Sequence, residues 1–162
     1  MKRNLAVTTF AMAFVALFVL NTAATAQAKR TQHLCSNATL AGKWGFTGTG
    51  SLIGIGPVAA TGIAAFDGKG NVSGSQTRSV NGDVADETFA GTYTVNSDCT
   101  ETHVVQVFLS GQLVRTTTVQ SVIDENGQHA RSIYSKVELP DGTLLPAVIT
   151  ADATRLFPKD ED

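Results

Sequence analysis

After residue 40 the chain is divided into short segments in which apolar and polar residues tend to alternate, and glycine-containing turns separate these segments. The segments are rich in Thr, Val, Ile and aromatic residues, which suit a pleated, half-buried strand. Asn-Gly and Asp-Gly pairs recur between them and tolerate the positive φ angles of tight hairpin turns. The pattern therefore predicts strands over residues 42–52, 58–67, 71–80, 84–96, 101–110, 112–124, 128–138 and 143–157.

The short connections make consecutive strands antiparallel neighbours, so the predicted fold class is all-β. Eight strands in an up-and-down meander are enough to close a small barrel, which leaves no exposed sheet edge. We predict a closed antiparallel barrel. A two-sheet β-sandwich is the alternative, because the pattern alone does not show closure.

The first 28 residues have the pattern of a secretory signal peptide. Lys2 and Arg3 precede a 16-residue apolar run that begins at Leu5, and an Ala-Gln-Ala site ends at Ala28. The run is shorter than the roughly 20 residues of a membrane-spanning helix. We therefore predict export to the periplasm or the extracellular space, with no integral membrane segment after cleavage. The remainder divides into an approach segment (29–40), a single barrel domain (41–158) and an acidic tail (159–162).

The charge of the mature chain disfavours one class of partner. Without Lys2 and Arg3, the 12 basic side chains fall to 10 against 14 acidic ones, which gives a formal net charge of −4. No basic patch is available to neutralise a phosphate backbone, so we predict no binding to nucleic acid. Nothing in the sequence specifies an oligomeric state.

Both cysteines, Cys35 and Cys99, lie in the exported part of the chain. Two thiols in an oxidising compartment predict one disulfide. They are 64 positions apart, and a disulfide that closes a loop of that length stabilises the folded state by about 4 kcal/mol, because it restricts the unfolded chain. No Cys-x-x-Cys spacing indicates a metal site.

The stretch AAFDGKGNVSG, Ala64–Gly74, has Asp67 and Asn71 where oxygen ligands of a calcium loop would lie. Counted from Asp67, a calcium loop of the EF-hand type needs an oxygen ligand at position three and a carboxylate at position twelve. Lys69 and Arg78 occupy these two positions. The stretch is therefore interpreted as a hairpin connection that Asp67 and Asn71 cap.

Other motifs with chemistry are missing from the sequence. His33, His103 and His129 are dispersed and have no metal-binding spacing, so we expect them at the surface and predict no metal site. Asp86 and Glu87 are adjacent and point to opposite faces of a strand, so they do not form a catalytic pair. Their default role is solubility. We predict no catalytic residue and no cofactor.

Alternation also indicates which side chains share the interior face. Phe89 and Tyr93 lie on one face of their strand, and Trp44 and Phe46 lie on one face of theirs. These four aromatic residues are the predicted contacts for a ligand. The glycines and alanines of the first two strands would either allow close packing or leave a cavity. Glu87 is two positions before Phe89, so the two side chains point to the same face of the strand and Glu87 could face the interior with Phe89.

In a closed meander the first and last strands are neighbours, which brings the sequence Gly42-Lys43-Trp44 near Arg155. The arginine plane would cover the indole, and its N–H groups would reach nearby carbonyls. We interpret Gly42, Trp44 and Arg155 as structural residues that close one barrel end.

These residues carry a resemblance to known families. The Gly-Lys-Trp sequence and the terminal arginine resemble the calycin-type barrels, the lipocalin and avidin-like group. The phrases FDGKGNVSG (66–74) and FAGTYTVNSDCT (89–100) resemble small exported bacterial proteins of unassigned function. The allene oxide cyclase-like barrel is a related eight-stranded family. The resemblance implies a barrel with an internal apolar pocket, but the chain lacks the second lipocalin motif and a C-terminal helix, and no activity is carried over.

Three functions follow as hypotheses. The first is a non-enzymatic exported barrel that binds a small apolar or amphipathic molecule. The second is a structural or protein-interaction module of the cell envelope with no ligand. The third is a cyclase or isomerase, which would need a buried polar residue such as Glu87 beside an apolar cavity.

Overall fold

The computed structural model describes residues 34–157. The predicted signal peptide (1–28), the beginning of the approach segment and the acidic tail lie outside the described residues. The elements, in chain order, are η1 (Asn37–Leu40), β1 (Gly42–Leu52), β2 (Gly56–Phe66), β3 (Asn71–Val80), β4 (Asp83–Val95), β5 (Thr100–Leu109), β6 (Gln112–Asp124), η2 (Glu125–Gly127), β7 (His129–Glu138) and β8 (Ala147–Leu156).

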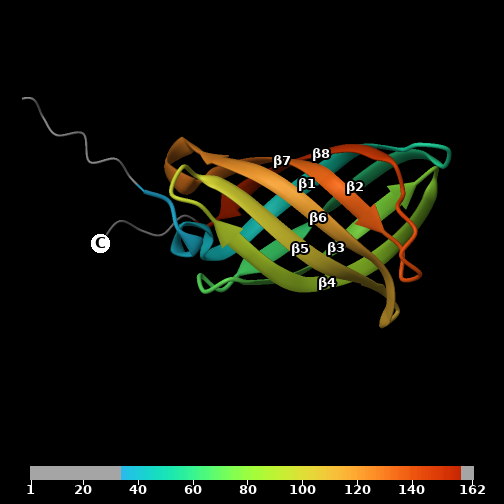
Figure 1. Ribbon diagram of the computed structural model, residues 1–162, viewed down its shortest axis with the longest axis horizontal. Helices are drawn as coiled ribbons and strands as arrows, with labels where there is room; N and C mark the ends of the chain where they lie inside the picture. The colour runs from blue at the N-terminus through green and yellow to red at the C-terminus, as the bar shows by residue number, and fades with distance from the viewer. Residues whose placement is uncertain (1–33, 158–162) are drawn as a thin grey trace, which may run out of the picture. The chain divides into compact units, whose positions relative to one another are not determined.

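The eight strands form one closed antiparallel barrel in sequential order (Figure 1). Each strand pairs with the next, and β8 returns to pair with β1, where Trp44 lies opposite Arg155. The predicted all-β, up-and-down barrel is confirmed, and the sandwich alternative is wrong. The closure matters for function because it encloses an interior that only the two ends of the barrel can open.

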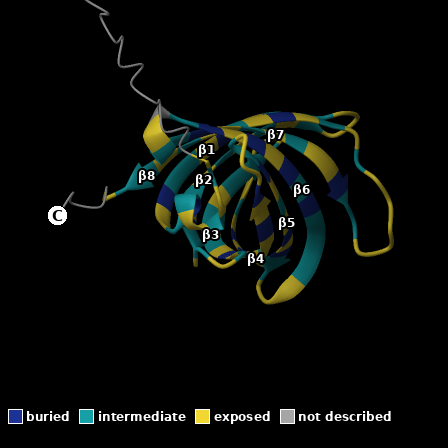
Figure 2. Cartoon of the chain, turned by 60° about the vertical axis from the view of Figure 1, so that its left-hand side comes forward, coloured by how far each residue is buried: buried dark blue, intermediate teal, exposed yellow. Residues whose placement is uncertain are grey.

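Burial follows the predicted period of two along the strands (Figure 2). In β4 the inward residues are buried while the residues between them are exposed. The inward set is Glu87, Phe89, Tyr93 and Val95, and the outward set is Asp86, Thr88, Ala90, Thr92 and Thr94. The register therefore places Glu87 inside the barrel with the aromatic residues.

Several glycines in the strands allow neighbouring strands and side chains to approach closely, and so do not leave empty space. A Cβ atom on Gly74 would lie 2.4 Å from the Phe89 ring, and one on Gly91 would lie 1.9 Å from the carbonyl oxygen of Val104. Both positions exclude a larger residue because of the facing strand. Gly48 differs, because it lines a cavity at one end of the barrel.

The β2–β3 connection is a hairpin turn that one carboxylate organises. The backbone N–H groups of Lys69, Gly70 and Asn71 donate to Asp67 Oδ1 at 2.7 to 2.9 Å, and the Asn71 side chain donates to Oδ2 at 2.6 Å. These bonds, the Asn71 side chain first, lower the pKa of Asp67 to about 2. The carboxylate thus has a turn-capping role in AAFDGKGNVSG.

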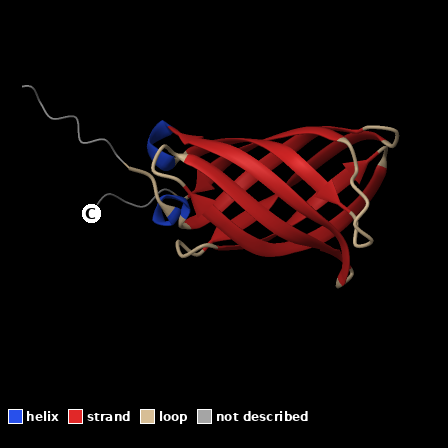
Figure 3. Cartoon of the chain, in the orientation of Figure 1, coloured by secondary structure: helices blue, strands red, loops and turns tan. Residues whose placement is uncertain are grey.

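Two parts of the fold differ from the sequence prediction. The last strand begins at Ala147 and not at residue 143, because residues 139–146 form a loop with its own hydrogen bonds and two prolines. Two short 3₁₀ helices, η1 and η2, were not predicted, and both lie at the same end of the barrel (Figure 3). A helix of three or four residues has no periodicity that a sequence could reveal.

Candidate functional site

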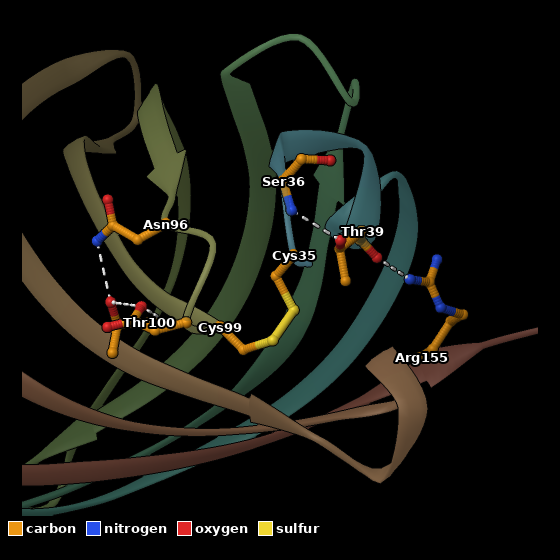
Figure 4. The surroundings of a disulfide bond; sticks show 8 residues. Cys35, Ser36, Thr39, Asn96, Cys99, Thr100 and Arg155 are labelled. Carbon is orange, nitrogen blue, oxygen red and sulfur yellow. Dashed lines mark hydrogen bonds between the residues drawn. A yellow bond between two sulfur atoms is a disulfide. The ribbon is translucent and has the colours of Figure 1, made fainter. Parts of the chain in front are cut away.

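One end of the barrel is closed by η1. The disulfide between Cys35 and Cys99 joins the segment before η1 to the β4–β5 turn (Figure 4). The Tyr93 hydroxyl donates to the carbonyl of Asn37 at 2.9 Å, and the Asn37 side chain accepts from the N–H of Val95 at 2.8 Å. The predicted disulfide therefore holds a short helix across the barrel opening.

Trp44 and Arg155 complete this closure. Trp44 is 1% exposed and its indole N–H donates to the carbonyl of Leu40 at 2.8 Å. The guanidinium carbon of Arg155 lies 4.7 Å from the centroid of the Trp44 ring. Arg155 also donates to the carbonyls of Thr39, Ala41 and Gly127. One arginine thus connects β8, the η1 segment and η2 over the indole.

The opposite end contains a cavity of about 470 Å³, which we call the outer cavity. It lies among the ends of β1, β3 and β7 and the beginnings of β2, β6 and β8. Its wall consists of Leu52, Ile55, Val58, Ala60, Val80, Val114, Val137, Leu139, Leu145 and Ile149. The volume falls within the range of roughly 300–1,000 Å³ that is usual for small-molecule sites.

The polar floor of the outer cavity is formed by Gln76, Arg78 and Arg115, and all three donate to Glu87, which does not itself line the cavity. We call these four side chains the ion-pair layer. Glu87 is 2% exposed. Arg115 donates to both of its carboxylate oxygens at 2.7 and 2.6 Å, Arg78 donates at 3.1 Å, and Gln76 donates at 2.7 Å. A buried carboxylate with this many donors is held in one place.

The electrostatics keep Glu87 ionised. Burial raises the pKa of Glu87, but the hydrogen bonds and charge of Arg115, with the donors from Gln76 and Arg78, outweigh burial and leave that pKa below its ordinary value. Tyr134 lies beside the layer, and burial raises the pKa of its hydroxyl. At neutral pH the floor therefore presents guanidinium groups and a neutral phenol.

A second cavity, of about 90 Å³, lies deeper in the barrel, and we call it the inner cavity. Gln76, Arg115 and Tyr134 line both cavities, so these side chains form the partition between them. Aromatic side chains of β1, β2 and β4 line one part of the inner cavity, namely Trp44, Phe46, Phe66 and Phe89. Polar side chains of β5, β6 and β7 line another part, namely Glu101, His103, Thr117, Ser121 and Ser132.

The four predicted ligand contacts are placed differently. Trp44, Phe46 and Phe89 line the inner cavity. Tyr93 is 3% exposed and is engaged with η1 through its hydroxyl. None of the four lines the outer cavity, whose wall is mainly aliphatic, with Asn81, Asp83 and Tyr134 as its polar members.

The histidines that the structure describes are in two kinds of surroundings. His129 lies 2.8 Å from carboxylate oxygens of both Asp152 and Asp124, which raise its pKa, with the Asp152 hydrogen bond the largest cause. His103 faces the barrel interior, with Nδ1 2.9 Å from Glu101 Oε1. The expected surface position is therefore wrong for His103, because residues 101 and 103 share the inward parity of β5. Within residues 34–157, no group of three potential ligands is arranged to hold a metal ion.

Several residues of the site were missed in the sequence. Arg115 was assigned no role, Arg78 was considered only against the calcium-loop pattern, and Glu87 was assigned solubility as its default role. The period of two in β6 could have indicated the polar interior, because Arg115, Thr117 and Ser121 share a face with Val119. The partners of Glu87 come from β3 and β6, and only the register of the closed barrel brings these strands together.

Comparisons with known proteins found distant structural likenesses and no match in sequence. No family model and no curated protein matches the chain. Among solved structures, it is similar to the S-type phycobiliprotein lyase CPES from Guillardia theta, with 9% identity and a TM-score of 0.45, over 82% of this chain and 99% of that one. It is also similar to Rv2717c from M. tuberculosis, with 14% identity and a TM-score of 0.42, over 74% and 94% of the two chains. Neither likeness transfers an activity. In the part of the chain that the structure describes, no helix is long and apolar enough to cross a bilayer.

Proposed function

We propose that this protein is an exported, non-enzymatic barrel that binds a small amphipathic molecule in the outer cavity. The observation that carries the proposal is the combination of an aliphatic wall with a fixed polar floor in a space of about 470 Å³. An aliphatic wall favours the apolar body of a ligand, and a few placed polar groups orient it. The disulfide supports export, since such bonds persist in oxidising compartments.

The floor favours a ligand whose polar end accepts hydrogen bonds. Arg78 and Arg115 line the outer cavity, and their side chains are 14% and 22% exposed. Arg78 also donates to the carboxylate of Asp83 at 2.7 Å, so this part of its charge is already paired. The Tyr134 hydroxyl also borders the cavity, and among the described residues it has no hydrogen-bond partner. A carboxylate, sulfonate or hydroxyl end group would meet these donors when the apolar body lies against the wall.

Glu87 does not favour the isomerase hypothesis. A general acid must hold a proton near neutral pH, and a general base needs a free lone pair that is directed at the substrate. The lowered pKa of Glu87 removes the proton, and Arg78, Gln76 and Arg115 occupy its oxygens. The role of Glu87 in this proposal is to position the two arginines.

The test uses decanoate as the probe, with two adjacent substitutions in β2. Ala60 lines the outer cavity and Ala59 is exposed on the outside of the barrel. Ala60→Phe would fill part of the cavity, whereas Ala59→Phe adds the same side chain outside. Isothermal titration calorimetry should show that wild type and A59F bind decanoate alike and that A60F binds it at least tenfold more weakly.

Two results would contradict the proposal. The first is that neither decanoate nor 1-decanol binds the wild-type protein. The second is that A60F and A59F bind decanoate with equal affinity while circular dichroism shows both to be folded. A preference for decanoate over 1-decanol would assign a charged end group to the guanidinium floor, whereas equal binding would assign a hydroxyl-type end group.

A further inference from the structure

The inner cavity contains a buried carboxylate that neither the fold nor the proposed function uses. Glu101 is 2% exposed and lies on β5. Its one hydrogen-bond partner among the described residues is His103, through Oε1. A carboxylate that is removed from water is costly unless opposite charge or several donors compensate it. Glu87 accepts four hydrogen bonds from three side chains, so Glu101 is the less satisfied of the two interior carboxylates.

A second and independent polar group points to the same space. Thr117, on β6, is 2% exposed, and its hydroxyl oxygen has no hydrogen-bond partner in the described structure. The residue lines the inner cavity. A buried hydroxyl without a partner costs about 1–3 kcal/mol. Native proteins rarely keep such a group without a water molecule or ligand to meet it.

The opposite part of the cavity consists of aromatic rings. Phe46 and Phe89 lie with ring centroids 6.1 Å apart, and Phe66 lies 6.4 Å from the ring of Trp44. Aromatic rings attract organic cations, and they do so more strongly where water is excluded. A carboxylate, an unpartnered hydroxyl and several rings around one cavity form the combination that suits an ammonium group.

Size and charge narrow the class of ligand. A volume of about 90 Å³ corresponds to roughly three water molecules at about 30 Å³ each, which allows a molecule of only a few heavy atoms. The cationic group that borders the cavity at the partition, Arg115, is already bound to both oxygens of Glu87. An anion would therefore meet the charge of Glu101 without a free cation to offset it.

We propose that the inner cavity is a second binding site, distinct from the outer cavity, and that it takes a small organic cation such as a methylated amine. The ammonium group lies against Glu101, its methyl groups contact the aromatic rings, and the Thr117 hydroxyl meets a water molecule or an N–H of the ligand. Gln76, Arg115 and Tyr134, which border both cavities, separate this site from the outer cavity.

The experiment compares two probes of similar shape, trimethylammonium chloride and neutral tert-butanol, at constant ionic strength. Binding is followed by calorimetry and by the NMR signals of the His103 ring. Wild type should bind trimethylammonium at least tenfold more tightly than tert-butanol. Glu101→Gln keeps the size of the side chain and should weaken cation binding at least tenfold. The matched control is Asp86→Asn, which removes the same charge from the outer face and should leave the affinity unchanged.

A second variant keeps the proposal testable if E101Q does not fold. Thr117→Val removes the hydroxyl with little change of shape, and it should weaken trimethylammonium binding about threefold while the thermal stability is unchanged or increased. The proposal is overturned if the two probes bind equally, if D86N weakens binding as much as E101Q, or if trimethylammonium does not bind. Decanoate binding to A60F is measured separately, so failure at the inner cavity is distinguishable from failure at the outer one.

Discussion

The two ends of the barrel are built from the same eight strands but differ in what their turns contact. At the η1 end, Cβ atoms on Gly68, Gly70 and Gly127 would lie 3.1 to 3.3 Å from residues of the η1 segment. At the outer-cavity end, the turn glycines have no atom within 4 Å of such a Cβ; they are Gly54, Gly82, Gly111 and Gly142. One set of turns is packed against a plug, and the other set surrounds an opening.

The difference extends to the side chains at each end. The η1 end holds the disulfide, the Trp44–Arg155 contact and the capped turn at Asp67. The other end exposes apolar side chains next to residues that line the outer cavity, such as Ile53 after Leu52 and Val84 after Asp83, which are 58% and 64% exposed. We infer that the stabilising contacts are concentrated at one end, which leaves the other free to admit a ligand. This division between the two ends can be tested by substitutions at each of them.

Removal of the disulfide should have the largest effect on stability. Cys35→Ala with Cys99→Ala releases a cross-link between residues 64 positions apart, which should lower the free energy of unfolding by about 4 kcal/mol. Urea denaturation measures the change. Decanoate affinity at a temperature where the variant stays folded should be unchanged, and a loss of binding in the folded variant would show that the two ends are not independent.

The ion-pair layer should come next. Glu87→Gln leaves Arg78 and Arg115 without a buried carboxylate, which should cost about 3 kcal/mol at pH 7. Since the pKa of Glu87 is below its ordinary value of 4.5 in the folded protein, its charge stabilises the fold above about pH 4.5, and this stabilisation is lost as the pH falls through the lowered pKa.

The pH profile provides the check on that assignment. The difference in unfolding free energy between wild type and E87Q should be largest near neutral pH and should close on acidification. Asp86→Asn, one residue away on the outer face, is the control for a general effect of charge. A gap that stays constant from pH 7 to pH 3 would show that the Glu87 carboxylate is not the source of the stabilisation.

Arg155→Met should have an intermediate effect at the η1 end. It removes the donors to the carbonyls of Thr39, Ala41 and Gly127 but keeps an apolar stem over Trp44. The free energy of unfolding should fall by about 2 kcal/mol. The loss is no larger because the carbonyls that lose their donors regain some hydration. Arg155→Lys keeps the charge and loses the fork, so recovery of full stability by R155K in thermal unfolding would show that charge alone accounts for the contact.

A change at the rim of the outer cavity should have the smallest effect. Ile53→Asn replaces an exposed apolar side chain in the β1–β2 turn, and the unfolding free energy should change by no more than about 0.5 kcal/mol. A loss of more than about 1 kcal/mol in the same urea assay would mean that the rim contributes to the fold and is not simply the border of an opening.

The sequence was sufficient for most of the architecture because the responsible signals are local. Turn residues and the period of two gave strands β1, β3 and β6 with the bounds that the structure has, and the other strands to within a few residues. The largest error, at the beginning of β8, arose where residues 143–146 continue an apolar pattern but Pro146 interrupts the strand.

The candidate site was harder to predict because its parts come from distant positions. The contacts of Glu87 depend on which residues of β3 and β6 face the interior at the same height in the barrel as Glu87. That height is set by the pairing register of several strands and cannot be read from one segment of the sequence. The polar part of the inner cavity was also missed, since Glu101 and His103 were separated in sequence from the aromatic residues that drew attention to the interior. Parity along β5 and β6 would have been the available signal.

The most direct test of the account is an NMR titration of the ¹⁵N-labelled protein with decanoate. We predict that amide signals shift at residues that border the outer cavity, including Val58, Val80 and Ile149, while signals of η1 and of the turn at Asp67 stay in place. Shifts confined to the η1 end or to the outer wall of the barrel, or no shifts at all, would contradict the assignment of the open end as the ligand site.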